Sequence, residues 1–203
     1  GLIHRLDVDT YGRIQKTYRT GTTGNALGIQ SVLQYYPNFP DITKGVTIYG
    51  PTGSVALTYD TVRDSEGRIT STQQNGAPQE TASYDTGDNG KGRLSGAETP
   101  DARTSYRYDI LGRVTQADTV VKKNGANATL TTTTDYNPIN GKVNRIGYGD
   151  GKAISYDYNG ITQQLQGLKY DGTLVVGYDY NSNGIIKTET LGNGIKIGYT
   201  YEK

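Results

Sequence analysis

The sequence lacks three residue types altogether. None of its 203 residues is cysteine, methionine or tryptophan, and phenylalanine occurs once. Without cysteine the chain can have neither a disulfide scaffold nor a zinc–thiolate site. Because position 1 is not methionine, we expect the chain to be a fragment or a processed piece of a larger protein.

Hydrophobic residues are also scarce. They make up 33% of the chain, below the roughly 45–50% that is usual in soluble domains, and the apolar runs are too short for a transmembrane helix. The 21 basic and 20 acidic residues are spread evenly along the sequence. Charge therefore predicts neither nucleic acid nor an anionic membrane as a partner.

Tyrosine and glycine are abundant, with 18 and 28 copies. Disordered chains are poor in aromatic and β-branched residues, whereas this chain is rich in Tyr, Thr, Ile and Val, which suit a pleated, half-buried surface. We therefore predict an all-β fold with many turns.

One short pattern returns along the chain: Asp or Asn, two residues, Gly, then usually Arg. It occurs at 9–13 (DTYGR), 64–68 (DSEGR), 89–93 (NGKGR), 109–113 (DILGR) and 181–185 (NSNGI), and with one extra residue at 137–142 (NPINGK). An Asx side chain can hydrogen-bond to the backbone two residues on, and Gly readily takes φ > 0. Each copy therefore predicts a turn between two strands.

A second pattern alternates with the first: Asx-Gly followed by a strand that ends in Tyr. It occurs at 150–158, 171–180 and 193–201, with a looser copy at 75–85. Asx-Gly is a strong hairpin signal, and the alternation of Ile154, Tyr156 and Tyr158 predicts a strand with one buried face. Tyrosines at 59, 84, 108, 136, 158, 180 and 201 mark units of two strands and two turns, the size of a repeat architecture.

Tyr-Asp-x-x-Gly-Arg at this spacing resembles the YD repeats of Rhs (rearrangement-hotspot) proteins, which also occur in bacterial Tc insecticidal toxin complexes, polymorphic toxins and teneurins. The full motif stands at 108–113, and the resemblance covers about residues 59–203. It implies antiparallel β-hairpins that form a curved, spiralling sheet, a section of a hollow shell around a C-terminal toxic polypeptide. Residues 1–58 are then a degenerate repeat with an irregular loop in the same shell, and residues 59–203 form about six to seven units.

The resemblance also implies a secreted or cell-surface bacterial protein, whose partners are the rest of the shell and the enclosed toxin polypeptide. The family's Asp-Pro-rich self-cleavage motif is absent from this sequence. The repeat positions that we expect to build the sheet are Tyr59, Asp60, Gly67, Tyr84, Asp85, Gly92, Tyr108, Asp109, Gly112, Arg113, Tyr136, Gly141, Tyr156, Tyr158, Tyr178, Tyr180, Gly184 and Tyr201.

Isolated candidates for chemistry have structural interpretations that we prefer. His4 is the only histidine and stands without a nucleophile motif. Asp7 and Asp9 lack the Gly and Glu of a calcium loop, and residues 87–92 (GDNGKG) lack the Lys-Ser/Thr of a phosphate loop. We expect no catalytic residue, no cofactor and no metal site.

The repeated charged residues leave other functions open. Two carboxylates among Asp60, Asp85, Asp109, Asp157 and Asp179 could serve glycoside hydrolysis, although their repeated context favours turn capping. We expect the arginines Arg13, Arg68, Arg93 and Arg113 to pair with neighbouring acids, and the tyrosines to pack across strands. The alternative to a structural shell is a module that binds a glycan or a cell-surface receptor through rows of Tyr and Arg.

Overall fold

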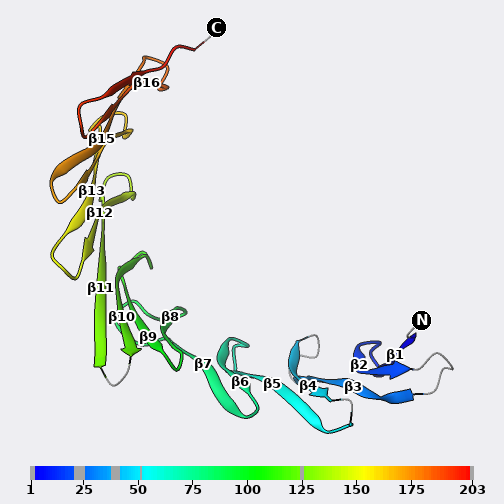
Figure 1. Ribbon diagram of the computed structural model, residues 1–203. Coiled ribbons are helices and arrows are strands. Elements are labelled where there is room, and N and C mark those ends of the chain that lie inside the picture. Colours follow the sequence, from blue (N-terminus) through cyan, green and yellow to red (C-terminus); the bar gives the residue numbers. More distant parts are fainter. Residues whose placement is uncertain (1–2, 21–25, 38–41, 51, 124–125, 202–203) are drawn as a thin grey trace. The chain divides into compact units, whose positions relative to one another are not determined.

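The structure is a computed structural model that describes residues 3–20, 26–37, 42–50, 52–123 and 126–201 (Figure 1). In these ranges the chain forms seventeen β-strands and no helix. The strands are β1 Ile3–Val8, β2 Ile14–Thr20, β3 Ala26–Tyr35, β4 Thr43–Tyr49, β5 Val55–Arg63, β6 Ile69–Gln74, β7 Ala77–Tyr84, β8 Leu94–Glu98, β9 Ala102–Tyr108, β10 Val114–Lys123, β11 Ala126–Tyr136, β12 Val143–Tyr148, β13 Ala153–Tyr158, β14 Leu165–Tyr170, β15 Thr173–Tyr180, β16 Ile186–Leu191 and β17 Lys196–Gly198. The predicted all-β fold is confirmed.

The chain forms two compact units. Unit 1 comprises Gly1–Ser83 with Ala97–Pro100, and unit 2 comprises Tyr84–Gly96 with Asp101–Lys203. In unit 1, strands β1 to β7 pair antiparallel in chain order, each with the next. In unit 2, strands β9 to β17 do the same. The sequence-based division at residue 58 falls inside β5, and the antiparallel pairing continues across it from β4 to β6.

Each odd-numbered strand passes into the next even-numbered strand through a segment that we call a corner. The corners are residues 9–13, 36–42, 64–68, 85–93, 109–113, 137–142, 159–164 and 181–185. In every corner the N–H of the first residue donates to the C=O of the last, at 2.8 to 3.2 Å. Because neighbouring strands are antiparallel, the corners of one unit lie along one edge of its sheet, and the other turns lie along the opposite edge.

A β-bulge follows nearly every corner, and the sequence patterns did not predict it. In β10, Val114 pairs with Tyr108 but Gln116 pairs with Arg107, so Thr115 has no partner on β9. The second residue of the strand is the extra one at the other bulges that follow a corner too: Gln15, Lys44, Thr70, Asn144, Gln166 and Lys187. A bulge increases local twist, so the repeat builds a regular twist into the sheet.

The sheet has no hydrophobic core. In the described ranges no hydrophobic side chain is buried, and the buried residues are Gly45, Gly90, Gly147, Gly167 and Ser95. Among the described residues of each unit, the strands contact their neighbours along the chain and no other strand. Stability must therefore come from nearest-neighbour interactions between strands, as in other repeat proteins.

Two further expectations concern loops in the first 58 residues. The glycines of residues 21–30 (GTTGNALGIQ) predict a turn-like segment, but residues 26–30 begin the ten-residue strand β3, and residues 21–25 lie outside the described residues. Residues 38–41 of the expected irregular loop lie outside the described residues. In the described ranges, no helix is long and apolar enough to cross a membrane.

The Asx-Gly turns were expected to be alike, but they are of two kinds. Asn75–Gly76 and Asp171–Gly172 have positive φ at both residues, as a two-residue type I′ hairpin requires. At 150–151 and 193–194 only the Gly has positive φ, and a longer turn closes between Tyr148 and Lys152 and between Leu191 and Ile195.

Where an added Cβ would meet no neighbouring atom, replacing a glycine should destabilise the sheet only if its backbone requires positive φ. Gly172 has φ +78, whereas Gly160 does not have positive φ, and a Cβ at either would meet nothing within 4 Å. We expect Gly172→Ala to lower the free energy of unfolding by about 1–2 kcal/mol, and Gly160→Ala to leave it unchanged or slightly raised. Urea titration of both variants tests this, and equal midpoints would contradict it.

Candidate functional site: the row of corners

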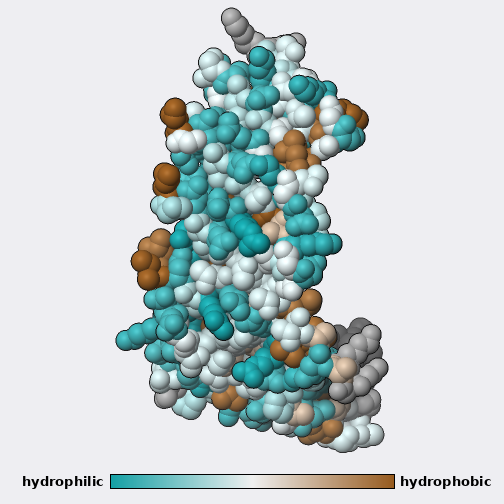
Figure 2. Space-filling view, turned by 90° about the vertical axis from the view of Figure 1, so that its left-hand side faces the viewer, coloured by the Kyte–Doolittle hydropathy of each residue, from teal (hydrophilic) through white to brown (hydrophobic). Residues whose placement is uncertain are grey.

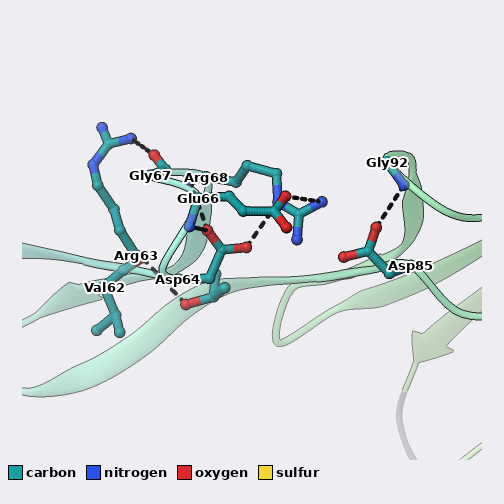
Figure 3. Close-up of polar contacts among 9 residues, drawn as sticks. Val62, Arg63, Asp64, Glu66, Gly67, Arg68, Asp85 and Gly92 are labelled. Atoms are coloured by element: carbon teal, nitrogen blue, oxygen red, sulfur yellow. Dashed lines mark hydrogen bonds and ion pairs between the residues drawn. The ribbon is translucent and has the colours of Figure 1, made fainter.

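A carboxylate closes each Asp-x-x-Gly-Arg corner. Asp109 Oδ1 accepts hydrogen bonds from the backbone N–H of Leu111 and of Arg113, both at 2.9 Å, and Oδ2 accepts from Arg113 Nε at 2.7 Å. The corners that begin at Asp9 and Asp64 repeat these three bonds within 0.1 Å. Figure 3 shows Asp64 held between the backbone N–H groups and the side chain of Arg68.

These bonds keep the corner carboxylates ionised. At Asp9, the hydrogen bond from the Arg13 side chain is the main cause that lowers the pKa. At Asp64 and Asp109, partial burial favours the neutral acid, but hydrogen bonds and charge from Arg68 and Arg113 outweigh it, so each pKa lies below its ordinary value. A general acid needs the opposite shift, so these groups suit turn closure and not proton transfer.

Asparagine serves the same purpose in the later corners. Asn181 Oδ1 accepts from the N–H groups of Asn183 and Ile185, both at 3.0 Å. Asn137 Oδ1 accepts from Ile139 at 2.8 Å and from Asn140 at 3.3 Å. An amide oxygen thus replaces the carboxylate as the acceptor, without the ion pair.

The corner at 159–164 was missed by the sequence patterns. Asn159 Oδ1 accepts from the N–H groups of Ile161 and Thr162 at 2.8 Å, but Gln163 takes the positive φ that glycine has elsewhere. Its position in the sequence could have identified this corner, because Asn159 directly follows Tyr158 as Asn137 directly follows Tyr136.

The corner at 85–93 begins earlier than its motif suggested. We expected Asn89 to be its first residue, but the closing bond runs from Asp85 N–H to Arg93 C=O at 3.0 Å. Asp85 Oδ1 also accepts from Gly92 N–H at 2.6 Å (Figure 3). Asn89 instead donates through Nδ2 to the backbone C=O of Tyr108 at 3.1 Å.

Tyrosines of the following strands contact many of the corners. In the described ranges six tyrosine hydroxyls donate to the backbone C=O of the residue just after the preceding corner, at 2.6 to 2.9 Å. The pairs are Tyr35 with Ile14, Tyr108 with Leu94, Tyr136 with Val114, Tyr158 with Val143, Tyr180 with Leu165 and Tyr201 with Ile186. We call this contact the tyrosine junction.

The junction satisfies a carbonyl that the sheet leaves unpaired. The β10–β11 ladder begins only at Gln116 and Thr133, because the strands part as they approach different corners. The C=O of Val114 therefore needs another donor, since an unpaired backbone group is costly, and the Tyr136 hydroxyl supplies one. Burial, with repulsion from Tyr156 and Tyr178, raises the pKa of Tyr158 and Tyr180 respectively, which keeps these hydroxyls protonated as donors.

The last residue of a corner also reaches toward the next one. The Arg113 guanidinium lies 4.0 Å from the centre of the Tyr136 ring, and Arg13 lies 4.2 Å from that of Tyr35, distances at which cation–π attraction applies. Arg113 further donates to the C=O of Gly141 at 3.2 Å.

In unit 2, side chains of other residue types also donate hydrogen bonds to the next corner. Lys142 Nζ donates to Gln163 C=O, and Gln164 Nε2 donates to Gly184 C=O, both at 3.0 Å. Side-chain donors therefore link successive corners from 109–113 to 181–185. Arg13, Arg68 and Arg113 pair with the acids of their own corners as expected, whereas Arg93 donates to the backbone C=O groups of Asn89 and Lys91. The neighbouring tyrosine is a contact that sequence reasoning missed.

Other predicted positions lie outside this pattern. Tyr59 and Asp60 were expected at a turn, but both lie within β5, because β-branched Thr61 and Val62 continue the strand. They line a groove of about 640 Å³ in unit 1, together with residues of β4, β6 and β7.

The remaining predicted residues lie in strands or in corners. Tyr84 ends β7, and Tyr156 and Tyr178 lie in β13 and β15 opposite Leu168 and Glu189. The glycines Gly67, Gly92, Gly112, Gly141 and Gly184 all have positive φ. Asp157 pairs with Lys169 at 2.7 Å. The side chain of His4 lies outside the described part of the structure. Within the described part, no three His, Cys, Asp or Glu side chains cluster as metal ligands would.

The sequence matches no model of a known family and no curated protein. Solved structures match nearly the whole chain. A crystal structure of TcdB2–TccC3–TEV is 15% identical with a TM-score of 0.63, covering 99% of this chain and 12% of that one. The Tc holotoxin pore of Photorhabdus luminescens is 15% identical with a TM-score of 0.59, and the match covers 99% of this chain and 12% of that one. TcdB2–TccC3 without its hypervariable C-terminal region is 14% identical with a TM-score of 0.51, and the match covers 97% of this chain and 13% of that one. This chain has the fold of a segment of these Tc toxin structures.

The likeness supports the relationship to YD-repeat proteins that the Tyr-Asp motif predicts. At 14–15% identity the shared feature is the fold. The chain spans about an eighth of the length of each matched chain.

Removing one junction hydroxyl should weaken the sheet measurably. Tyr136→Phe deletes the donor to Val114 C=O and leaves the ring, so we expect the free energy of unfolding to fall by about 1 kcal/mol. Tyr170→Phe is the matched control, because in the described ranges the Tyr170 hydroxyl makes no hydrogen bond. Denaturant unfolding of both variants tests the junction, and an equal effect of the two changes would speak against it.

The corner carboxylates should make the sheet sensitive to acid. Their pKa values are lower folded than unfolded, so the stability they add is complete above about pH 4 and disappears as the pH falls through the folded-state pKa. We expect Asp109→Asn to reduce this loss, because the amide still accepts the two backbone bonds as Asn181 does. Thermal unfolding between about pH 5 and pH 2 measures this, and parallel curves for wild type and variant would refute it.

Proposed function

We propose that this chain is a structural segment of the wall of a hollow β-shell, in a secreted, toxin-related bacterial protein that encloses a toxic polypeptide. The observation that carries the proposal is a sheet without a hydrophobic core that is held together along its corners. Most globular domains bury apolar side chains between two layers. A single layer held by neighbour contacts suits a wall, whose length can grow by adding repeats.

The partners we propose are the remainder of the shell and the polypeptide inside it. The fold likeness to Tc toxin structures supports this, and it extends to the one that lacks the hypervariable C-terminal region. A wall does not depend on which polypeptide it encloses. Secretion or exposure at the cell surface belongs to the same proposal.

We propose a structural and not an enzymatic role for the repeated charged residues. The corner carboxylates are ionised and bonded to their own arginines. The tyrosine hydroxyls donate to backbone carbonyls, and Arg13 and Arg113 cover tyrosine rings. These groups are engaged within the sheet, which weighs against the alternative that rows of Tyr and Arg bind a glycan or a receptor.

Protection from proteases tests this proposal in the full-length protein that contains the chain. We expect the enclosed polypeptide to be digested by proteinase K roughly tenfold or more slowly within the shell than when it is expressed alone, because digestion inside requires the wall to open. Combining Arg113→Gln with Tyr136→Leu should speed its digestion. A polypeptide that is digested equally fast in both forms contradicts enclosure.

A further inference from the structure

Three consecutive corners of unit 2 carry large apolar side chains that point into solvent. The exposed fractions are 87% for Ile110, 68% for Leu111, 79% for Ile139 and 93% for Ile161. They occupy the tips of the corners at 109–113, 137–142 and 159–164. Figure 2 shows separate hydrophobic groups standing out along one side of the molecule, between hydrophilic stretches.

The hairpin geometry does not require these residues. The same tip positions are Ser65 and Glu66 in the corner at 64–68, and Ser182 and Asn183 in the corner at 181–185, and those corners close by the same bonds. Turn tips are normally polar, and exposed apolar groups in a row indicate an interaction surface.

The apolar tips form a periodic row. Strands β9 to β14 pair in chain order, so these corners lie along the same edge, two strands apart. Strands in a sheet are about 4.8 Å apart, which spaces the tips by about 10 Å. A partner that contacts all three tips must present apolar groups at the same period, and another ribbon of this repeat does so.

Charge also favours a second copy. The three corners contain one ion pair, Asp109 with Arg113, and one further charge, Lys142. Two such rows can approach each other with little repulsion, whereas a strongly charged partner would find few groups to pair with.

We infer that the row formed by Ile110, Leu111, Ile139 and Ile161 is a contact surface for a second copy of this repeat ribbon. In a two-fold arrangement the same surface serves both copies. The middle tip, Ile139, then meets Ile139 of the second copy, while Leu111 of each copy meets Ile161 of the other. This contact is separate from enclosure of a polypeptide and can fail or hold independently of it.

Disulfide cross-linking tests the arrangement cleanly, because the chain has no cysteine. On mild oxidation, Ile139→Cys should give a disulfide-linked dimer on a non-reducing gel. Leu111→Cys and Ile161→Cys should cross-link when mixed with each other but poorly alone, because identical outer tips lie about 20 Å apart across the two-fold axis.

Ser182→Cys is the matched control. Its corner lies two steps from the axis, which places the two copies of this residue about 40 Å apart. It is an exposed tip of similar geometry, so random collision would cross-link it as fast as Ile139→Cys. Equal cross-linking of the two variants, or none in Ile139→Cys at about 100 μM protein, overturns the inference.

Sedimentation equilibrium gives an independent readout. We expect the 203-residue chain to dimerise, and Ile139→Ser with Ile161→Ser to weaken the dimer at least about tenfold without changing the unfolding midpoint that is measured at concentrations where the chain is monomeric. Ile195→Ser, an exposed isoleucine at the opposite edge, should leave the dimer intact. A monomeric wild-type chain, or equal weakening by Ile195→Ser, contradicts a second copy as the partner.

Discussion

The contact on which this structure depends is a tyrosine hydroxyl that donates to a backbone carbonyl of the preceding strand. Tyr136 and Val114 are one example among six in the described ranges. In a domain with a core, such a bond would add little to a large apolar term. Here no hydrophobic side chain is buried in the described part, so polar contacts between neighbouring strands carry a larger share of the stability.

The corner and the junction depend on each other. Next to a corner, the strand that follows it parts from the next strand along the chain. The backbone ladder between these two strands ends there and leaves a carbonyl without a partner. The tyrosine closes that gap, and the last residue of the corner lies over its ring or donates to the next corner, as Arg113 does. Each hairpin repeat therefore stabilises the next one, and a ribbon of such repeats can be long without a second layer of structure.

Local chemistry made much of the fold predictable. Asp109 and Gly112 identify their corner because a carboxylate cap and a positive φ are properties of a few adjacent residues. The junction was not predictable in the same way, because the partner of Tyr136 lies in another strand and becomes available only where the β10–β11 ladder ends at Gln116 and Thr133. Tyr59 was misplaced for a related reason, since Tyr-Asp without a following turn glycine is an ordinary strand dipeptide. The corner at 159–164 was missed because Gln163 takes the conformation usually given to glycine.

A double-mutant cycle between Arg113 and Tyr136 tests most directly whether corners are held by their neighbours. Unfolding free energies are measured for wild type, Arg113→Gln, Tyr136→Leu and the double variant. The cation–π contact at 4.0 Å predicts a coupling energy of about 0.5–1 kcal/mol, with the double variant less destabilised than the sum of the two single ones. Strict additivity would contradict the account, because the two residues would then stabilise the sheet independently.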